Sequence, residues 1–168
     1  LAATPVDHPW GYRNRVRFVF GNRAAAAPRR LGALVMGHYA RGSRRVIPVE
    51  ECPVHDERGN AFAFRAGDTF TAAGLNAAST DRGVLRSLVV RVGCGTDETM
   101  ATLVVSHDGD RRLRSVTRRL LEQDPPTSMH LNLHPRDDAF IFGPETRRLM
   151  GPERMREQVA GASFLLSP

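Results

Sequence analysis

The segment YRNRVRFVF, residues 12–20, places three arginines at every second position of an otherwise apolar run. Successive side chains of an extended strand point to opposite faces, so Arg13, Arg15 and Arg17 would share one face, with apolar side chains on the other. Guanidinium groups about 7 Å apart on one face repel one another, and an anionic partner such as a phosphate would relieve that repulsion. An edge strand with solvated or carboxylate-paired arginines would explain the same pattern.

Two histidines are the best candidates for a metal or acid–base cluster. His130 and His134 in MHLNLHPRDD would share a strand face, near Asp137 and Asp138. No GxGxxG after a strand, no P-loop and no HExxH motif accompanies them. A small independent enzyme using His130, His134 and Asp137 is therefore one hypothesis, and retention of zinc, iron or manganese by the purified protein would support it.

The two cysteines, Cys52 and Cys94, cannot form a disulfide framework, and neither belongs to a CxxC pair. Cys94 lies in a polar turn and is interpreted as a turn thiol rather than a nucleophile. Cys52 is followed by Pro53 at the exit of an expected strand, where it could direct a thiolate toward a metal cluster. One cysteine cannot hold a cluster alone, and a half-buried thiol is the alternative.

The composition favours a polyanionic partner. The chain has 168 residues and a formal net charge of +6, and all 24 of its basic residues are arginine. Arginine without lysine also reflects a GC-rich genome, so the clustering carries more weight than the count. The clusters lie at 13–17, 41–45, 111–119 and 147–156.

Targeting signals are absent from the sequence. No apolar run approaches the length of a membrane span, and the first residues lack a secretory signal pattern. The protein is therefore expected to be cytoplasmic, without a membrane partner. Because the chain starts at leucine and stops directly after the apolar run ASFLLS, we expect it to be an excised piece of a longer polypeptide.

The apolar periodicity predicts an α+β fold, with about two helices packed on a mostly antiparallel β-sheet. Strands are predicted over 12–20, 31–39, 44–50, 84–93, 100–106 and 128–134, and near 139–142 and 157–166. Helices are predicted within 54–80 and over 110–123. The second and third strands are expected to pair antiparallel, and the fourth and fifth to form a hairpin.

Several stretches, in order, resemble a known family. They are PWGYRNRVRF, GHYARGSRRVIPVEECPVHD, LRSLVVRVG followed by MATLVV, and the closing FLLSP. Together they resemble the central region of the S-adenosylmethionine-dependent RNA (uracil-5-)-methyltransferases, which act on uracils of 23S ribosomal RNA and transfer RNA. The resemblance spans most of residues 9–168. It implies that residues 1–168 are the single central α+β domain of a longer chain, without that family's RNA-binding TRAM barrel and Rossmann-type methyltransferase domain.

The resemblance also implies a division of labour. The family's catalytic cysteine, its base and its S-adenosylmethionine site would lie after Pro168, so this piece would be inactive alone. Its role would be to contact RNA, with 23S rRNA the expected target, beside TRAM and methyltransferase domains of the parent enzyme. A freestanding basic RNA-binding module without methyl transfer is the alternative, and the coding sequence after FLLSP would separate the two.

Two features carry over residue by residue. Cys52 in EECPV stands where iron–sulfur members place the last of four cysteine ligands, which implies a [4Fe-4S] cluster in the parent if the other three ligands lie upstream. Arg13, Arg15 and Arg17 match the family's arginine-rich segment near the RNA groove. The turn and strand after GHY add Arg41, Arg44 and Arg45 as RNA-binding candidates, although these could equally form a solvated turn. Arginine suits this role because it donates bidentately to phosphate and stacks on unpaired bases.

Overall fold

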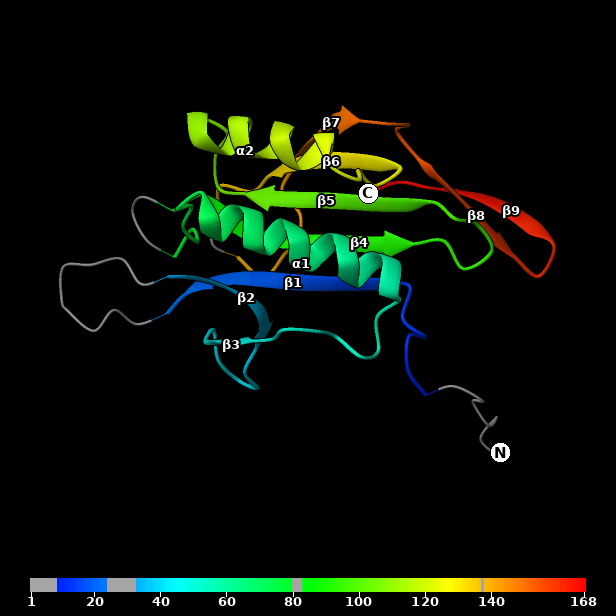
Figure 1. Cartoon of the computed structure of the whole chain (residues 1–168), viewed down its shortest axis with the longest axis horizontal. Coiled ribbons are helices and arrows are strands. Elements are labelled where there is room, and N and C mark those ends of the chain that lie inside the picture. The colour runs from blue at the N-terminus through cyan, green and yellow to red at the C-terminus, as the bar shows by residue number, and fades with distance from the viewer. Residues whose placement is uncertain (1–8, 24–32, 80–82, 137) are drawn as a thin grey trace.

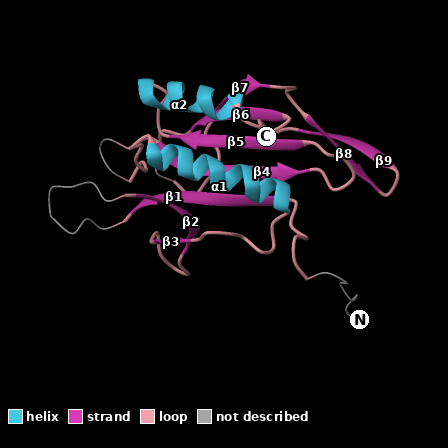
Figure 2. Cartoon of the chain, in the orientation of Figure 1, coloured by secondary structure: helices cyan, strands magenta, loops and turns pink. Residues whose placement is uncertain are grey.

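The computed structural model describes residues 9–23, 33–79, 83–136 and 138–168. Within these residues, seven strands form one sheet, two helices cover one of its faces, and a two-stranded hairpin stands at one side (Figures 1 and 2). In chain order the elements are β1 Arg15–Asn22, β2 Leu34–Tyr39, β3 Val46–Pro48, α1 Glu57–Ala72, β4 Leu85–Val92, β5 Thr99–Val105, α2 Arg111–Glu122, β6 Ser128–Leu133, β7 Glu145–Met150, β8 Met155–Val159 and β9 Ala162–Leu166.

The strand order in the large sheet is β3-β2-β1-β4-β5-β6-β7. Neighbouring strands are antiparallel except β5 and β6, which are parallel because α2 carries the chain back to the other end of the sheet between them. The α+β class, the antiparallel β2–β3 pair and the β4–β5 hairpin are therefore confirmed.

The core lies between the sheet and the helices. Phe18 of β1 and Leu88 of β4 are opposite each other and fully buried, and the Phe18 ring meets Phe64 of α1 edge-on at 5.3 Å. Phe20 of β1 meets Phe70 of α1 in the same way at 5.9 Å. The alternation predicted for the first strand thus places its apolar face against α1.

Each helix begins at an aspartate. The Asp56 carboxylate accepts from the Arg58 backbone N–H at the start of α1. The Asp110 carboxylate accepts from the Arg112 and Leu113 N–H groups at the start of α2. These caps satisfy donors that a helix leaves without internal partners, and they fix where both helices start.

Two strand predictions near the C-terminus are wrong. Residues 139–142 form no strand, and the strand that follows is β7, whose exposed sequence ETRRLM lacks apolar alternation. The single strand predicted over 157–166 is a hairpin, β8 and β9, that turns at Ala160 and Gly161 with φ values of 50° and 81°. None of the described helices is long and apolar enough to span a membrane.

Gly59 in the first turn of α1 is expected to tolerate no side chain. An added Cβ would lie 2.3 Å from Cε1 of the buried His55 ring and 2.9 Å from a methyl group of Val92. Gly59→Ala should therefore destabilise the fold by roughly 1–3 kcal/mol, although alanine is the better helix former. Gly67→Ala in the same helix is the control, because its Cβ would meet only the flexible end of Met36 at 3.2 Å. Urea unfolding of both variants measures the difference, and equal stabilities would contradict this prediction.

A buried carboxylate attaches the β8–β9 hairpin to the turn between β4 and β5. Glu157 accepts from the backbone N–H groups of Cys94 and Gly95, each at 3.0 Å, and of Gln158 at 2.9 Å. Burial alone would raise the pKa of Glu157, but these three donors and the Arg91 guanidinium outweigh it and lower the pKa. The ionised form therefore favours the docked hairpin.

Stability should depend on pH through this group. Because its pKa is lower in the folded protein than the ordinary value of 4.5, the stabilisation from Glu157 is complete above pH 4.5 and is lost as the pH falls through the folded value. The stability advantage of the native protein over Glu157→Gln should accordingly shrink on acidification. Urea unfolding across pH 7 to 3 measures it, and a pH-independent difference would refute the linkage.

Candidate functional site

The face of the sheet opposite the helices, called the back face here, is crossed by an irregular segment, of which residues 134–136 and 138–143 are described. Arg86 of β4 donates to the Pro135 carbonyl at 3.4 Å, and the Arg15 guanidinium of β1 lies 5.8 Å from the centre of the Phe142 ring. The segment therefore leaves β6, passes behind the middle strands and returns to β7. The apolar run AFIF, predicted as a strand, serves as this crossing.

Asn132 of β6 fixes where the crossing returns. It is fully buried, and its amide nitrogen donates to the carbonyls of Gly143 and Glu145, each at 3.1 Å, and to the Thr146 hydroxyl at 2.8 Å. Its amide oxygen accepts from the Gly143 N–H at 2.7 Å. At the other end of the segment, His134 Nε2 lies 3.0 Å from the Phe140 carbonyl oxygen and 3.2 Å from the Asp138 carboxylate.

A pocket of about 610 Å³ opens between this segment and the β1–β3 end of the sheet. It is lined by Arg17, Phe20, Gly21, Asn22, Tyr39, Arg44, Arg45, Val46, Ala78, Ser79, Leu85, Arg86, His134, Asp138, Ala139, Phe140 and Ile141. We call it the arginine pocket, because four of these side chains carry guanidinium groups. Tyr39 and Phe140 add exposed rings, and Phe140 is 71% exposed. Cations and flat apolar surfaces thus face one cavity.

Arg17 is the best-placed cation in this pocket. Its side chain is half-buried, and no hydrogen bond or ion pair joins its guanidinium to another described residue. Burial lowers the pKa of Arg17, Tyr39 opposes that shift, and the nearby Arg86 adds to it. Arginine stays protonated even so, and the result is a partly desolvated positive charge that an anion would stabilise.

The remaining arginine candidates divide into two groups. Arg44 and Arg45 are exposed in the turn before β3 and line the arginine pocket together with Arg17. Arg15 begins β1 opposite Arg91 and contacts Phe142, outside the pocket. Arg13 precedes β1, which starts three residues later than predicted, and its guanidinium lies 6.0 Å from the Tyr12 ring. The alternating arginines 13, 15 and 17 form no ion pair with a carboxylate of the described residues.

The histidine cluster gains no support as a metal site. His130 and His134 are both buried on the back face, and Asp137 lies outside the described residues. Burial and the Arg148 guanidinium lower the pKa of His130, and Glu153 opposes this shift. The lowered pKa favours a neutral ring. No group of three potential metal ligands occurs in the described part of the chain.

Cys52 is more buried than the half-buried thiol that was expected. It is 6% exposed within the apolar core, whereas Cys94 is exposed at the β4–β5 turn. A [4Fe-4S] cluster normally takes four cysteine thiolates, and this chain has two cysteines in different surroundings. The residues present therefore do not fit a cluster held by this chain.

Sequence reasoning missed Arg86, Tyr39 and Phe140 as pocket residues. Arg86 lies at a register shift between β4 and β5, and such an irregularity cannot be read from periodicity. Phe140 belongs to a stretch that was assigned to a strand. The signal that could have found it is Gly143-Pro144 directly after AFIF, which is typical of an irregular segment.

No family model matches the chain. It is 30% identical over 163 residues to a protein of Gloeobacter violaceus named as an uncharacterized RNA methyltransferase, covering 95% of this chain and 34% of the relative. It is 32% identical over 178 residues to a protein of the same description from Parasynechococcus marenigrum, covering 96% and 36%. The chain thus spans about a third of the length of these RNA methyltransferases, to which it is homologous.

A solved structure shares the fold. It is the Pyrococcus abyssi tRNA (uracil-54, C5)-methyltransferase in complex with S-adenosyl-L-homocysteine, with a TM-score of 0.67 and 19% identity. The match covers 96% of this chain and 36% of that one. At this level of identity the similarity establishes the α+β architecture alone.

Proposed function

We propose that the chain is the RNA-contacting central domain of a longer RNA (uracil-5-)-methyltransferase whose target is 23S ribosomal RNA. Two findings support the proposal. The chain is homologous to about a third of proteins named RNA methyltransferases, and its fold matches part of a tRNA uracil-C5 methyltransferase. The size of the match fits one domain among several, with TRAM and methyltransferase domains as the intramolecular neighbours.

The arginine pocket is the observation that carries the RNA-binding role. Arg17 is partly buried and has no carboxylate partner among the described residues, and Arg44 and Arg45 line the same cavity from the turn before β3. Guanidinium groups donate to phosphate oxygens, while the rings of Tyr39 and Phe140 offer surfaces for an unpaired base. A uracil inside a folded RNA must leave its stack before carbon 5 can be reached, and the pocket would hold the distorted strand.

Methyl transfer itself is assigned to the parent protein. S-adenosylmethionine would supply the methyl group from a site outside this chain, and the nucleophilic cysteine would lie there too. In this chain the cations position RNA, since phosphate contacts fix orientation and specify little sequence. The isolated chain is accordingly expected to bind RNA and to leave uridines unmethylated. In an iron–sulfur parent, Cys52 would contribute one ligand beside cysteines from elsewhere, and Cys52→Ser would remove the cluster absorbance.

Binding of RNA by the full 168-residue chain tests the proposal. Fluorescence anisotropy with a uracil-containing stem–loop of 23S rRNA, with tRNA and with polyglutamate should give tighter binding of the RNAs than of the acidic polymer. A preference for the rRNA stem–loop over tRNA would support the stated target. If the chain binds polyglutamate as tightly as RNA, the pocket is a non-specific basic surface. Uridine methylation by the longer protein would support the methyltransferase, and its absence would support a freestanding RNA-binding module.

A further inference from the structure

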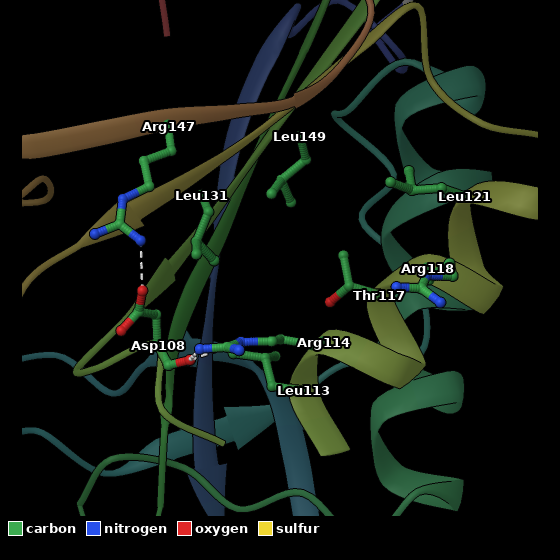
Figure 3. A pocket seen from close by; sticks show the side chains of 9 residues that line it. All are labelled: Asp108, Leu113, Arg114, Thr117, Arg118, Leu121, Leu131, Arg147 and Leu149. Atoms are coloured by element: carbon green, nitrogen blue, oxygen red, sulfur yellow. Dashed lines mark hydrogen bonds and ion pairs between the residues drawn. The ribbon is translucent and has the colours of Figure 1, made fainter. Parts of the chain in front are cut away.

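A second cavity lies on the helix side of the sheet, between α2 and the strands β6 and β7 (Figure 3). Its volume is about 430 Å³. We call it the α2–β7 groove, and it is lined by Asp108, Leu113, Arg114, Thr117, Arg118, Leu121, Leu131, Arg147 and Leu149. It shares no lining residue with the arginine pocket.

The floor of the groove is apolar and mostly buried. Leu113 and Leu131 belong to the core, and Leu149 is the one strongly exposed leucine of the lining, at 40%. One exposed leucine offers too little apolar surface for a protein partner, since a stable interface buries about 800 Å² on each side. The volume falls instead in the range of small-molecule sites, roughly 300–1,000 Å³.

Thr117 adds an unpartnered polar group to this floor. It is 7% exposed, and its hydroxyl oxygen has no hydrogen-bond partner among the described residues. Threonines in α1 behave differently, because Thr69 and Thr71 donate to the carbonyls of Arg65 and Gly67 one turn back. In Figure 3 the Thr117 hydroxyl instead points into the space between α2 and the strands. A buried hydroxyl without a partner is costly, and a ligand atom would satisfy it.

The rim of the groove is cationic. Arg147 pairs with the carboxylates of Asp108 and Glu145. Arg114 donates to the backbone carbonyl of Asp108 at 3.2 Å rather than to a carboxylate. The structure shows no hydrogen bond or ion pair from Arg118 to another described residue. Because Arg114 and Arg118 are like charges four residues apart on one helix, an anion between them would relieve their repulsion.

We propose that the α2–β7 groove binds an unstacked nucleotide. The base lies against the leucines, the Thr117 hydroxyl hydrogen-bonds an edge of the base, and the phosphate meets Arg114 and Arg118 at the rim. These are the features of a nucleotide site, an apolar floor with one orienting polar group and a cation for the phosphate. The nucleotide is either free in solution or an unpaired residue of an RNA chain, and the site does not depend on RNA binding at the arginine pocket.

An NMR titration of the full chain tests the site. The probes are uridine monophosphate, adenosine monophosphate and a uridine tetranucleotide, with an acidic leucine-rich peptide as competitor. A nucleotide should shift the amide resonances of residues 113–121 and 147–149. Tighter binding of the tetranucleotide than of the mononucleotides would indicate that the groove binds a nucleotide of an RNA chain. Tighter binding of the mononucleotides would indicate that it binds a free nucleotide. Absence of shifts at millimolar nucleotide, or tighter binding of the peptide, would overturn the proposal.

Matched variants make the test specific. Thr117→Val should weaken nucleotide binding about three- to tenfold while leaving the melting temperature unchanged or higher, because it removes a buried hydroxyl that has no partner in the described part of the chain. Arg118→Gln should weaken binding about tenfold. Arg119→Gln is the control, since Arg119 is exposed on the same helix and does not line the groove. If Thr117→Val and the native chain bind the nucleotide with equal affinity, the Thr117 hydroxyl does not contact the nucleotide.

The outcome is distinguishable from that of the RNA-binding proposal. Arg17→Gln should leave the nucleotide-induced shifts at residues 113–121 intact even if it abolishes binding of the rRNA stem–loop. Loss of those shifts in Arg17→Gln would mean that both effects arise at the arginine pocket, and would overturn the separate site.

Discussion

Replacing Arg17, Arg44 and Arg45 together with glutamine is expected to weaken binding of the rRNA stem–loop about 1,000-fold at low salt. Each guanidinium lines the arginine pocket, and a charge-assisted hydrogen bond to phosphate accounts for roughly tenfold in affinity. The dependence of log affinity on log salt should flatten by about one unit for each phosphate that the variant no longer neutralises. Anisotropy titrations at several salt concentrations measure both quantities.

A matched control separates this pocket from the overall charge. Arg111→Gln, Arg119→Gln and Arg154→Gln together remove the same charge from exposed positions outside the arginine pocket. That variant should retain most of the affinity. If its affinity and salt slope fall as far as those of the pocket variant, RNA binding follows net charge, and the pocket has no special role. Replacing Arg13 and Arg15, which lie outside the pocket, should have an intermediate effect if RNA extends along β1.

Asn132→Ala is expected to have the largest effect on stability, a decrease of about 2–4 kcal/mol in the free energy of unfolding. The Asn132 side chain is fully buried and is engaged by two carbonyls, a hydroxyl and a backbone N–H of segment 143–146. Its removal leaves these groups buried without partners. Urea unfolding measures the decrease, and hydrogen exchange should show faster exchange of the Gly143 amide.

The same change should damage the arginine pocket. Phe140 and Ile141 form one wall of the pocket, and they belong to the segment that Asn132 holds in place. RNA affinity of the folded variant should therefore fall although no arginine has been changed. Asn76→Ala is the control, because the Asn76 side chain donates only one long hydrogen bond, of 3.5 Å to the Gly74 carbonyl, within the described residues. If Asn132→Ala and Asn76→Ala unfold at the same urea concentration, the anchoring role of Asn132 is wrong.

The fold could be predicted where apolar periodicity was strong. The β4–β5 hairpin combines β-branched runs with a polar turn, and α2 has Leu113, Val116 and Leu120 at helical spacing with an aspartate cap and two prolines after its end. The prediction failed after residue 134. There β7 is exposed and polar, while the apolar AFIF crosses the back face without a strand partner, so local hydrophobicity pointed to the wrong segment.

The candidate site was predictable in part for a similar reason. Alternation alone placed Arg17 on the face away from the core. It could not show that the turn carrying Arg44 and Arg45 would meet that face, because this depends on how β3 pairs at the sheet edge. Nor could it show which of the three alternating arginines would line the arginine pocket. The inclusion of Arg17 and the exclusion of Arg13 and Arg15 are properties of the tertiary structure.

The strand order has a consequence for the folding kinetics. The large sheet consists of two halves that are each continuous in the chain, β1–β3 and β4–β7, and they join only where β1 pairs with β4. Pairing within each half is between strands close in sequence, whereas joining brings Val16 opposite Val90. Loop closure makes that pairing the slowest to form. We therefore expect the pairing of β1 with β4, across which α1 packs, to be the last native interaction to form in the transition state for folding.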